Sequence, residues 1–229
     1  MLQQTQVARV VERYERWLAR WPDVFALAGA PPADVLAEWS GLGYNRRALR
    51  LREAALHVAR EGWPRDAAGL RALPGVGPYT AAAVASFAFG EPVAAVDVNV
   101  ARVAARIGRG TPHELLPAGR EAAWNQAAME LGATVCRARR AACGECPAAR
   151  WCRSRDAVVV APRGAGPPRE RFEDSNRWVR GRVVAALAAG EGVPADIPPE
   201  RLGPALEGLE RDGLVERDQA GWRLPGVLD

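Results

Sequence analysis

Apolar residues recur at intervals of three and four along most of the chain, which is the period of an amphipathic α-helix. The apolar residues at helical spacing between positions 5 and 21 are Val7, Val10, Val11, Tyr14, Trp17, Leu18 and Trp21. Further helical segments lie at residues 33–61, 66–89, 98–107 and 118–133, and the first two of these each hold a pair of helices. No strand-like alternation occurs before residue 155, so we predict that this part is all-α.

The C-terminal part has a different pattern. A linker is predicted at residues 156–176, because the sequence APRGAGPPRERFEDS is rich in Pro, Gly and charge. Helices are then predicted at about 177–189 and 199–212, followed by two short strands around a turn at 218–221. Helix, helix and hairpin predict a small winged-helix-like module over residues 177–229. Such a module would bind DNA, bind a protein or cover the first domain.

Composition excludes several classes of protein. Apolar residues make up 48% of the 229 positions, which allows a substantial core and excludes a chain that is disordered throughout. No apolar run approaches the roughly 20 residues needed to cross a bilayer, so we expect a soluble intracellular protein without membrane contact. The net charge is +4, and all 31 basic residues are arginine. A chain without lysine has no side-chain amine for Schiff-base chemistry.

All four cysteines lie in one short stretch with the spacing C-x6-C-x2-C-x5-C. They are Cys136, Cys143, Cys146 and Cys152. In a reducing compartment, cysteines clustered in this way favour metal binding over disulfides. A zinc ribbon usually contributes two C-x2-C pairs and only one is present, whereas unequal loops can surround a 4Fe–4S cluster. The spacing therefore favours the cluster over zinc, with disulfides or free thiols as the remaining alternatives.

Two other motifs carry candidate chemistry. In LPGVGPY, Gly75 and Gly77 would form a tight helical hairpin that approaches a ligand closely, and the next helix would present N–H groups to an anion such as a DNA phosphate. Asp97 stands in an apolar run directly before a helix. It would be either a structural N-cap or a partly desolvated carboxylate that stabilises positive charge on a substrate.

Six motifs in this order carry a resemblance to a known family. They are MLQQTQV, GLGYNRRA, LPGVGPYTAAAVASFAFG, VDVNVARV, WNQAAMELGATVC and the cysteine spacing. Together they resemble the helix-hairpin-helix DNA glycosylases with an iron–sulfur cluster, the endonuclease III superfamily, and within it the adenine-mismatch branch (MutY-type). The resemblance covers about residues 1–152. It implies a two-lobed glycosylase domain over residues 1–155, with a 4Fe–4S cluster loop at 136–152.

The resemblance also implies an activity and roles for single residues. Asp97 matches the aspartate that stabilises the sugar cation, and Tyr79 stands where bifunctional members carry a Schiff-base lysine, so we expect a monofunctional glycosylase. Tyr44 matches an aromatic wedge beside the opposite base, with a core or turn tyrosine as the alternative, and Gln126 matches a contact to the flipped adenine. The other expected DNA contacts are Gln3, Gln4, Gly75, Gly77, Arg137, Arg139 and Arg140.

Residues outside these motifs are assigned structural roles. Trp124 and Met129 are expected in the core rather than in a pocket, and His57 and His113 at structural or surface positions. The implied partner is double-stranded DNA with a mismatched or oxidised base. The implied substrate is adenine opposite 8-oxoguanine or guanine, acted on by a monomer in the bacterial cytoplasm at the nucleoid. A thymine or uracil mismatch glycosylase and a non-catalytic lesion sensor are the alternatives.

The sequence departs from the family pattern at both ends. In the family, the glutamate that protonates adenine lies two residues before Met-Leu-Gln-Gln-Thr, and here that string begins the chain. Either the natural start lies upstream, or the protein is truncated and weakened; we expect the chain as given to bind DNA better than it cleaves it and to expose apolar surface. Residues 177–229 replace a larger domain that recognises 8-oxoguanine. Discrimination against guanine would then be weaker or rest on Tyr44, Gln3 and Gln4.

Overall fold

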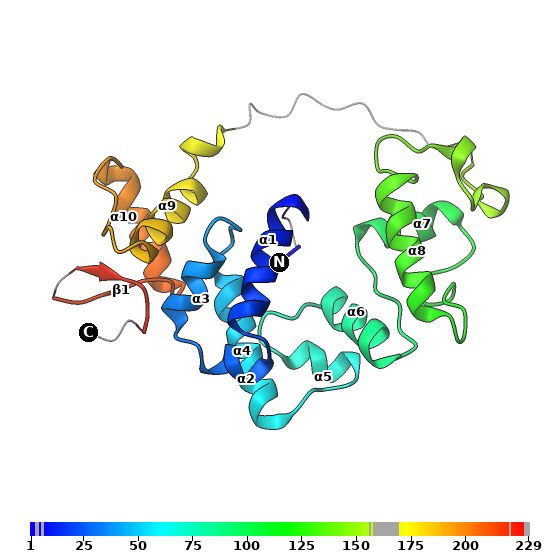
Figure 1. The fold of residues 1–229 in the computed structure, drawn as a ribbon. Helices are drawn as coiled ribbons and strands as arrows, with labels where there is room; N and C mark the ends of the chain where they lie inside the picture. The colour runs from blue at the N-terminus through cyan, green and yellow to red at the C-terminus, as the bar shows by residue number, and fades with distance from the viewer. Residues whose placement is uncertain (3–4, 6, 156, 158–169, 220, 227–229) are drawn as a thin grey trace. The chain divides into compact units, whose positions relative to one another are not determined.

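The computed structural model describes residues 1–2, 5, 7–155, 157, 170–219 and 221–226, and their regular structure is mostly helical (Figure 1). In chain order the elements are α1 (Val7–Arg20), α2 (Val24–Gly29), α3 (Pro32–Trp39), α4 (Arg46–Glu61), α5 (Ala67–Ala72), α6 (Pro78–Phe89), α7 (Val98–Ile107), α8 (Glu121–Thr134), η1 (Cys143–Glu145), η2 (Ala149–Trp151), η3 (Phe172–Asp174), α9 (Asn176–Ala188), α10 (Pro199–Arg211), β1 (Glu216–Arg217) and β2 (Trp222–Arg223). Before residue 155, the described residues form helices and one isolated antiparallel bridge, Cys136 to Ala141. The all-α prediction is therefore confirmed.

The chain divides into two compact units. Unit 1 comprises Met1–Gly62 together with Pro167–Asp229, and unit 2 comprises Trp63–Gly166. Unit 1 is built around tryptophans: the ring of Trp17 lies edge-on to Trp21 at 4.6 Å and to Trp39 at 5.6 Å between centroids. Such edge-to-face pairs add to the stabilisation that burial of the rings supplies.

The C-terminal elements share the core of unit 1. Helix α9 packs against α3, and the apolar side chains of α9 and α10 belong to the same buried cluster as the tryptophans. The most deeply buried of these residues are Val179, Val183, Val184, Ala205 and Leu209. The two-stranded hairpin of β1 and β2 follows, with Glu216 opposite Arg223. The predicted order of helix, helix and hairpin is present (Figure 1), and this module covers the N-terminal helices.

Unit 2 is held together by small side chains. Helices α5 and α6 pack as a hairpin, α7 packs against α8, and α6 also contacts α8. The buried positions of α6 are Ala81, Ala82, Ala85 and Ser86. Side chains of this size let helices approach closely, and the remaining core is supplied by residues such as Leu70 and Val100.

Several local expectations differ from the structure. Helix α2 was not predicted, and it begins at an N-cap, Asp23, whose carboxylate accepts a hydrogen bond from the Ala26 amide at 2.8 Å. The apolar residues of α1 do not share one buried face: Val10 and Trp17 are buried, whereas Val7 and Tyr14 are more than half exposed. The predicted linker lies largely outside the described residues. The predicted domain boundaries stay a prediction.

Candidate active site and cysteine pocket

The hairpin between α5 and α6 has the tight turn that its sequence predicts. Gly75 has a φ of +77°, a conformation that favours glycine, and the Val76 amide donates to the Leu73 carbonyl at 3.1 Å. Gly77 has a φ of −86°, which any residue adopts, so its backbone conformation does not require glycine. A Cβ at Gly77 would enter open space, and Gly77 supplies no side-chain cap to α6. The start of α6 therefore has open space beside Gly77.

Asp97 is the N-cap of α7. Its Oδ1 accepts hydrogen bonds from the backbone amides of Asn99 at 2.8 Å and Val100 at 2.7 Å. Its Oδ2 accepts a hydrogen bond from the Asn99 side-chain amide at 2.8 Å. The structural interpretation is thus confirmed, and the catalytic role stays a prediction. The half-buried carboxylate is held in one orientation by three donors.

Tyr79 lies near Asp97 but comes from a different helix, α6. Its hydroxyl donates to the sulfur of Met129 on α8 at 2.8 Å. Burial raises the pKa of the Tyr79 phenol, and the negative charge of Asp97 raises it further. The phenol therefore stays neutral at physiological pH. Met129 is half-buried, and it also contacts Tyr79. Gln126, also on α8, is exposed to solvent.

A buried asparagine that sequence reasoning did not single out positions the segment before Asp97. The side chain of Asn125 is fully buried. Its Oδ1 accepts a hydrogen bond from the Ala95 amide at 2.9 Å, and its Nδ2 donates to the Val93 carbonyl and to Ser86 Oγ, each at 2.9 Å. Asn125 thereby joins α8, α6 and the extended segment that leads to Asp97. The signal in the sequence was a polar pair, Asn125 and Gln126, inside the otherwise apolar stretch WNQAAM.

A second polar connection runs from Asp97 to the cysteine loop. Asn99 accepts a hydrogen bond through its Oδ1 from Arg102 Nη2 at 2.8 Å. The same Arg102 donates to the Gly132 carbonyl at 2.7 Å and, through Nε, to the Cys136 carbonyl at 3.0 Å. The chain of contacts thus leads from the Asp97 carboxylate through two side chains to the backbone of the first cysteine. No local sequence pattern indicated these roles for Asn99 and Arg102.

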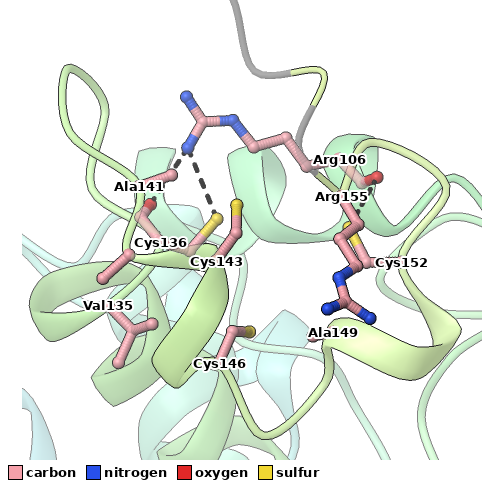
Figure 2. A pocket seen from close by; sticks show the side chains of 10 residues that line it. Arg106, Val135, Cys136, Ala141, Cys143, Cys146, Ala149, Cys152 and Arg155 are labelled. Carbon is pink, nitrogen blue, oxygen red and sulfur yellow. Dashed lines mark hydrogen bonds between the residues drawn. The ribbon is translucent and has the colours of Figure 1, made fainter.

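The four cysteines line one pocket in unit 2 (Figure 2). Cys136 follows α8, Cys143 begins η1, and Cys146 and Cys152 directly follow η1 and η2. The rest of the lining is apolar except for two arginines, and consists of Arg106, Val135, Ala141, Ala142, Ala149 and Arg155. Within the described residues, no three His, Cys, Asp or Glu side chains are gathered as a site for one metal ion. The thiols surround a space rather than meet at a point.

Arg106, in the last turn of α7, holds the cysteine loop in place. Its guanidinium donates to the carbonyls of Cys136, Arg137 and Ala138 at 3.3, 2.8 and 3.0 Å, and lies 3.4 Å from Cys136 Sγ (Figure 2). The bridge between Cys136 and Ala141 closes a short loop beyond these contacts. The side chains of Arg137, Arg139 and Arg140 in this loop are exposed. The loop therefore presents three positive charges to solvent from a fixed backbone.

Tyr44 lies in unit 1, between Gly43 and the start of α4. It has a φ of +51° and is 45% exposed, so it is not a core tyrosine. The guanidinium of Arg47 lies 5.7 Å from its ring centroid, and Arg177 of α9 donates to its hydroxyl at 3.0 Å. This contact to the C-terminal module was not predicted.

The other predicted residues include Gln3, Gln4 and His57. Gln3 and Gln4 lie outside the described residues. His57 is half-buried as a residue, with a side chain that is 40% exposed and lies 3.2 Å from Glu61 one turn along α4, which agrees with a structural or surface position. In the part of the chain that the structure describes, every helix is too short or too polar to span a bilayer.

Comparisons with known proteins agree on a family. A family model described as the HhH-GPD superfamily of base excision DNA repair proteins matches residues 1–124. The adenine DNA glycosylase of Mycobacterium tuberculosis (strain CDC 1551 / Oshkosh) is 43% identical over 256 aligned positions, which cover 99% of this chain and 83% of that protein. The adenine DNA glycosylase of Homo sapiens is 44% identical over 177 positions, 69% of this chain and 32% of that protein.

Solved structures of the same fold are more distant in sequence. The structure of a thermostable thymine-DNA glycosylase has a TM-score of 0.62 at 26% identity, covering 69% of this chain and 81% of that one. A non-covalent endonuclease III–DNA complex has a TM-score of 0.58 at 25% identity, covering 68% of this chain and 80% of that one.

Proposed function

The chain belongs to the HhH-GPD superfamily of base excision DNA repair proteins, and we infer that it is a DNA glycosylase that removes adenine from DNA. The observation that carries this inference is the similarity to adenine DNA glycosylases along nearly the whole chain. Similarity to the thymine-DNA glycosylase structure is lower in identity and covers less of the chain, so adenine is favoured over thymine. We further propose that the adenine stands opposite 8-oxoguanine or guanine.

Asp97 has the chemistry that this reaction needs. The base is turned out of the duplex, and hydrolysis of its N-glycosidic bond develops positive charge on the sugar. A carboxylate that already points in one direction stabilises this charge without reorganising when it appears. Two backbone amides and the Asn99 side chain hold Asp97 in this way. We assign Asp97 the role of stabilising the sugar cation.

Tyr79 and the absence of lysine support a monofunctional reaction. A lyase step through a covalent amine intermediate needs a nucleophilic side-chain amine, and the sequence contains no lysine. The neutral Tyr79 phenol, engaged with Met129, offers a hydroxyl beside Asp97 rather than an amine. Borohydride added during turnover should therefore trap no covalent complex with DNA, and a trapped complex in good yield would refute this proposal.

The cysteine pocket supports a resident 4Fe–4S cluster. Cys136, Cys143, Cys146 and Cys152 are four thiols around one mostly apolar space, which is the donor set of such a cluster. The single C-x2-C pair, where a zinc ribbon usually has two, favours a cluster over a zinc ion. When bound, the cluster would cross-link the loop and take no part in base chemistry.

DNA contacts are proposed on both units. The uncapped N-terminus of α6 would receive a backbone phosphate, and the loop arginines Arg137, Arg139 and Arg140 would bind neighbouring phosphates. Tyr44 would stack beside the base opposite the lesion, where such stacking contributes about 1–3 kcal/mol. Gln126 would contact the displaced adenine, and Gln3 and Gln4 the opposite base.

Excision assays with enzyme in excess over DNA test the substrate assignment. Duplexes with adenine opposite 8-oxoguanine, adenine opposite guanine, thymine opposite guanine and uracil opposite guanine separate the candidate activities. We expect excision from the two adenine duplexes alone. Preferential release of thymine or uracil would overturn the assignment, and binding without release of any base would support a lesion sensor.

The role of Asp97 is tested by Asp97→Asn. Asparagine is as good an N-cap as aspartate, so this variant keeps the cap of α7 while removing the charge. We expect adenine excision to be lost while DNA binding and the melting temperature are largely retained. Asp23→Asn is the matched control, because Asp23 caps α2 and has no place in the proposed site. Near-native excision by Asp97→Asn would show that the carboxylate is not needed.

A further inference from the structure

Arg177 connects the C-terminal module to Tyr44. It lies in the first turn of α9, and its Nη1 donates to the Tyr44 hydroxyl at 3.0 Å across 133 residues of sequence. Its guanidinium carbon lies 5.2 Å from the Tyr44 ring centroid and 5.0 Å from the Phe172 ring centroid. One planar cation thus contacts two exposed aromatic side chains, and one of them is the proposed wedge.

The backbone conformation of Tyr44 is unusual for a residue with a side chain. Its φ of +51° is in the left-handed region, which disfavours a residue with a Cβ. The side chain is 45% exposed, so core packing alone does not hold it. Backbone conformations of this kind persist where surrounding contacts determine them. The guanidiniums of Arg47 and Arg177 both lie within contact distance of the Tyr44 ring.

The helix that carries Arg177 is packed into the core of unit 1. Ser175 caps α9, and Val179 and Val183 bury the helix in the core of unit 1. Asp212, after α10, pairs with Arg180 of α9 and with Arg46 at the start of α4, two residues beyond Tyr44. Among the described residues, Arg177 itself pairs with no carboxylate, and its side-chain contacts are to the two rings. A fixed helix therefore brings a cation to an otherwise weakly held aromatic side chain.

We propose that Arg177 is a positioning residue that sets the Tyr44 side chain for insertion into DNA, so that the C-terminal module contributes to DNA recognition through Tyr44. This inference rests on the proposed function, because it takes Tyr44 as the wedge. It gives the module a role beyond covering the N-terminal helices. Arg177 acts through the tyrosine and not as an independent phosphate contact.

A double-mutant cycle on DNA binding separates these two roles. The probe is a duplex that carries 2′-fluoro-2′-deoxyadenosine, which resists hydrolysis, opposite 8-oxoguanine. Arg177→Gln should weaken binding about fivefold or more in the native background, and less than about twofold when Tyr44 is already alanine. Arg177→Lys keeps the charge but loses the planar contact with the rings, so it should bind as weakly as Arg177→Gln.

Arg182→Gln is the matched control, because Arg182 is on the same helix but contacts Asp196, at 2.6 Å, and the Trp178 ring instead of Tyr44. It should bind the probe as the native protein does. Equal losses from Arg177→Gln in the two backgrounds, or recovery of binding in Arg177→Lys, would show a direct phosphate contact and overturn the proposal. Native binding by Arg177→Gln would overturn it as well.

A measurement without DNA distinguishes failure of this inference from failure of the proposed function. The chain has three tyrosines, so protein labelled with 3-fluorotyrosine gives three ¹⁹F resonances, and Tyr44→Phe assigns one of them. Arg177→Gln should shift the Tyr44 resonance and leave those of Tyr14 and Tyr79 in place. An unchanged Tyr44 resonance refutes the inference even if adenine is excised. If the resonance shifts but the protein neither excises adenine nor binds the probe, the proposed function and the wedge role are refuted, whereas the contact between Arg177 and Tyr44 is not.

Discussion

Replacing Asn125 with leucine tests whether one buried amide holds the segment that ends at Asp97. Leucine has a similar size but no polar atoms, so the Ala95 amide and the Val93 carbonyl lose their partner. Ser86, which is 2% exposed, also loses its contact, although a hydroxyl can rotate toward another acceptor. The variant therefore leaves two backbone groups without a hydrogen bond, the Ala95 amide in a buried site and the Val93 carbonyl in a part-buried one.

The size of the effect follows from these groups. A buried backbone group without a partner costs about 1–3 kcal/mol, so two of them cost about 2–6 kcal/mol. Burial of the leucine methyl groups offsets part of this, which leaves an expected loss of about 2–4 kcal/mol in the stability of unit 2. By the relation of about 1.4 kcal/mol per tenfold, amide exchange in residues 91–97 should accelerate by about 30-fold or more.

Hydrogen–deuterium exchange of peptides that span residues 91–97 gives the local measurement, and urea unfolding followed by circular dichroism gives the global one. Gln126→Leu is the control, because Gln126 is the next residue on α8 but is exposed. It should change stability by less than about 0.5 kcal/mol. If Asn125→Leu changed stability and exchange no more than Gln126→Leu, the three hydrogen bonds would not hold the segment, and the reasoning would fail.

Three further predictions concern the rest of the site. Because the pKa of Tyr79 is raised above its ordinary value of 10.0, the folded protein keeps the phenol neutral at pH values where the unfolded chain ionises. The stability that this residue contributes is complete below pH 10 and falls as the pH rises toward the folded pKa. The urea midpoints measured at about pH 9 and 10.5 should therefore differ less in Tyr79→Phe than in the native protein. Replacing Arg137, Arg139 and Arg140 by glutamine should reduce the slope of log Kd against log salt by about 2–3, since each phosphate contact contributes about 0.9, and an unchanged slope would exclude these contacts. Cys146→Ala should remove the broad absorbance near about 400 nm expected of an iron–sulfur cluster and destabilise the loop, whereas a colourless native protein that contains zinc would contradict the proposed cofactor.

Local signals explain why much of the fold was predictable. Helix α7 occupies residues 98–107 as expected, because Asp97 caps its start and Gly108, with a φ of +68°, ends it. The turn at Gly75 is likewise encoded by its own residues. Helix α2 was missed because six residues between prolines carry too little periodicity, although its cap, Asp23, was visible in the sequence.

The motifs themselves also identified Asp97, Tyr79 and the four cysteines as candidates. These residue types have chemistry that their neighbours lack, and their spacing resembles a known family. The structure places Tyr79 near enough to Asp97 for the carboxylate to raise the pKa of the phenol, and it gathers the cysteines around one pocket.

The contacts that support these residues were decided by tertiary structure alone. Asn125 reaches Ala95 across 30 residues, Arg102 reaches Cys136 across 34, and Arg177 reaches Tyr44 across 133. Hydrophobic periodicity predicts which side of a helix is buried, but it does not predict which distant polar atoms that burial brings together. An arginine or asparagine also has the same local signature whether it faces solvent or a carbonyl from another helix. The sequence by itself thus determined the helices and the reactive groups of this protein, and packing determined how those groups are held.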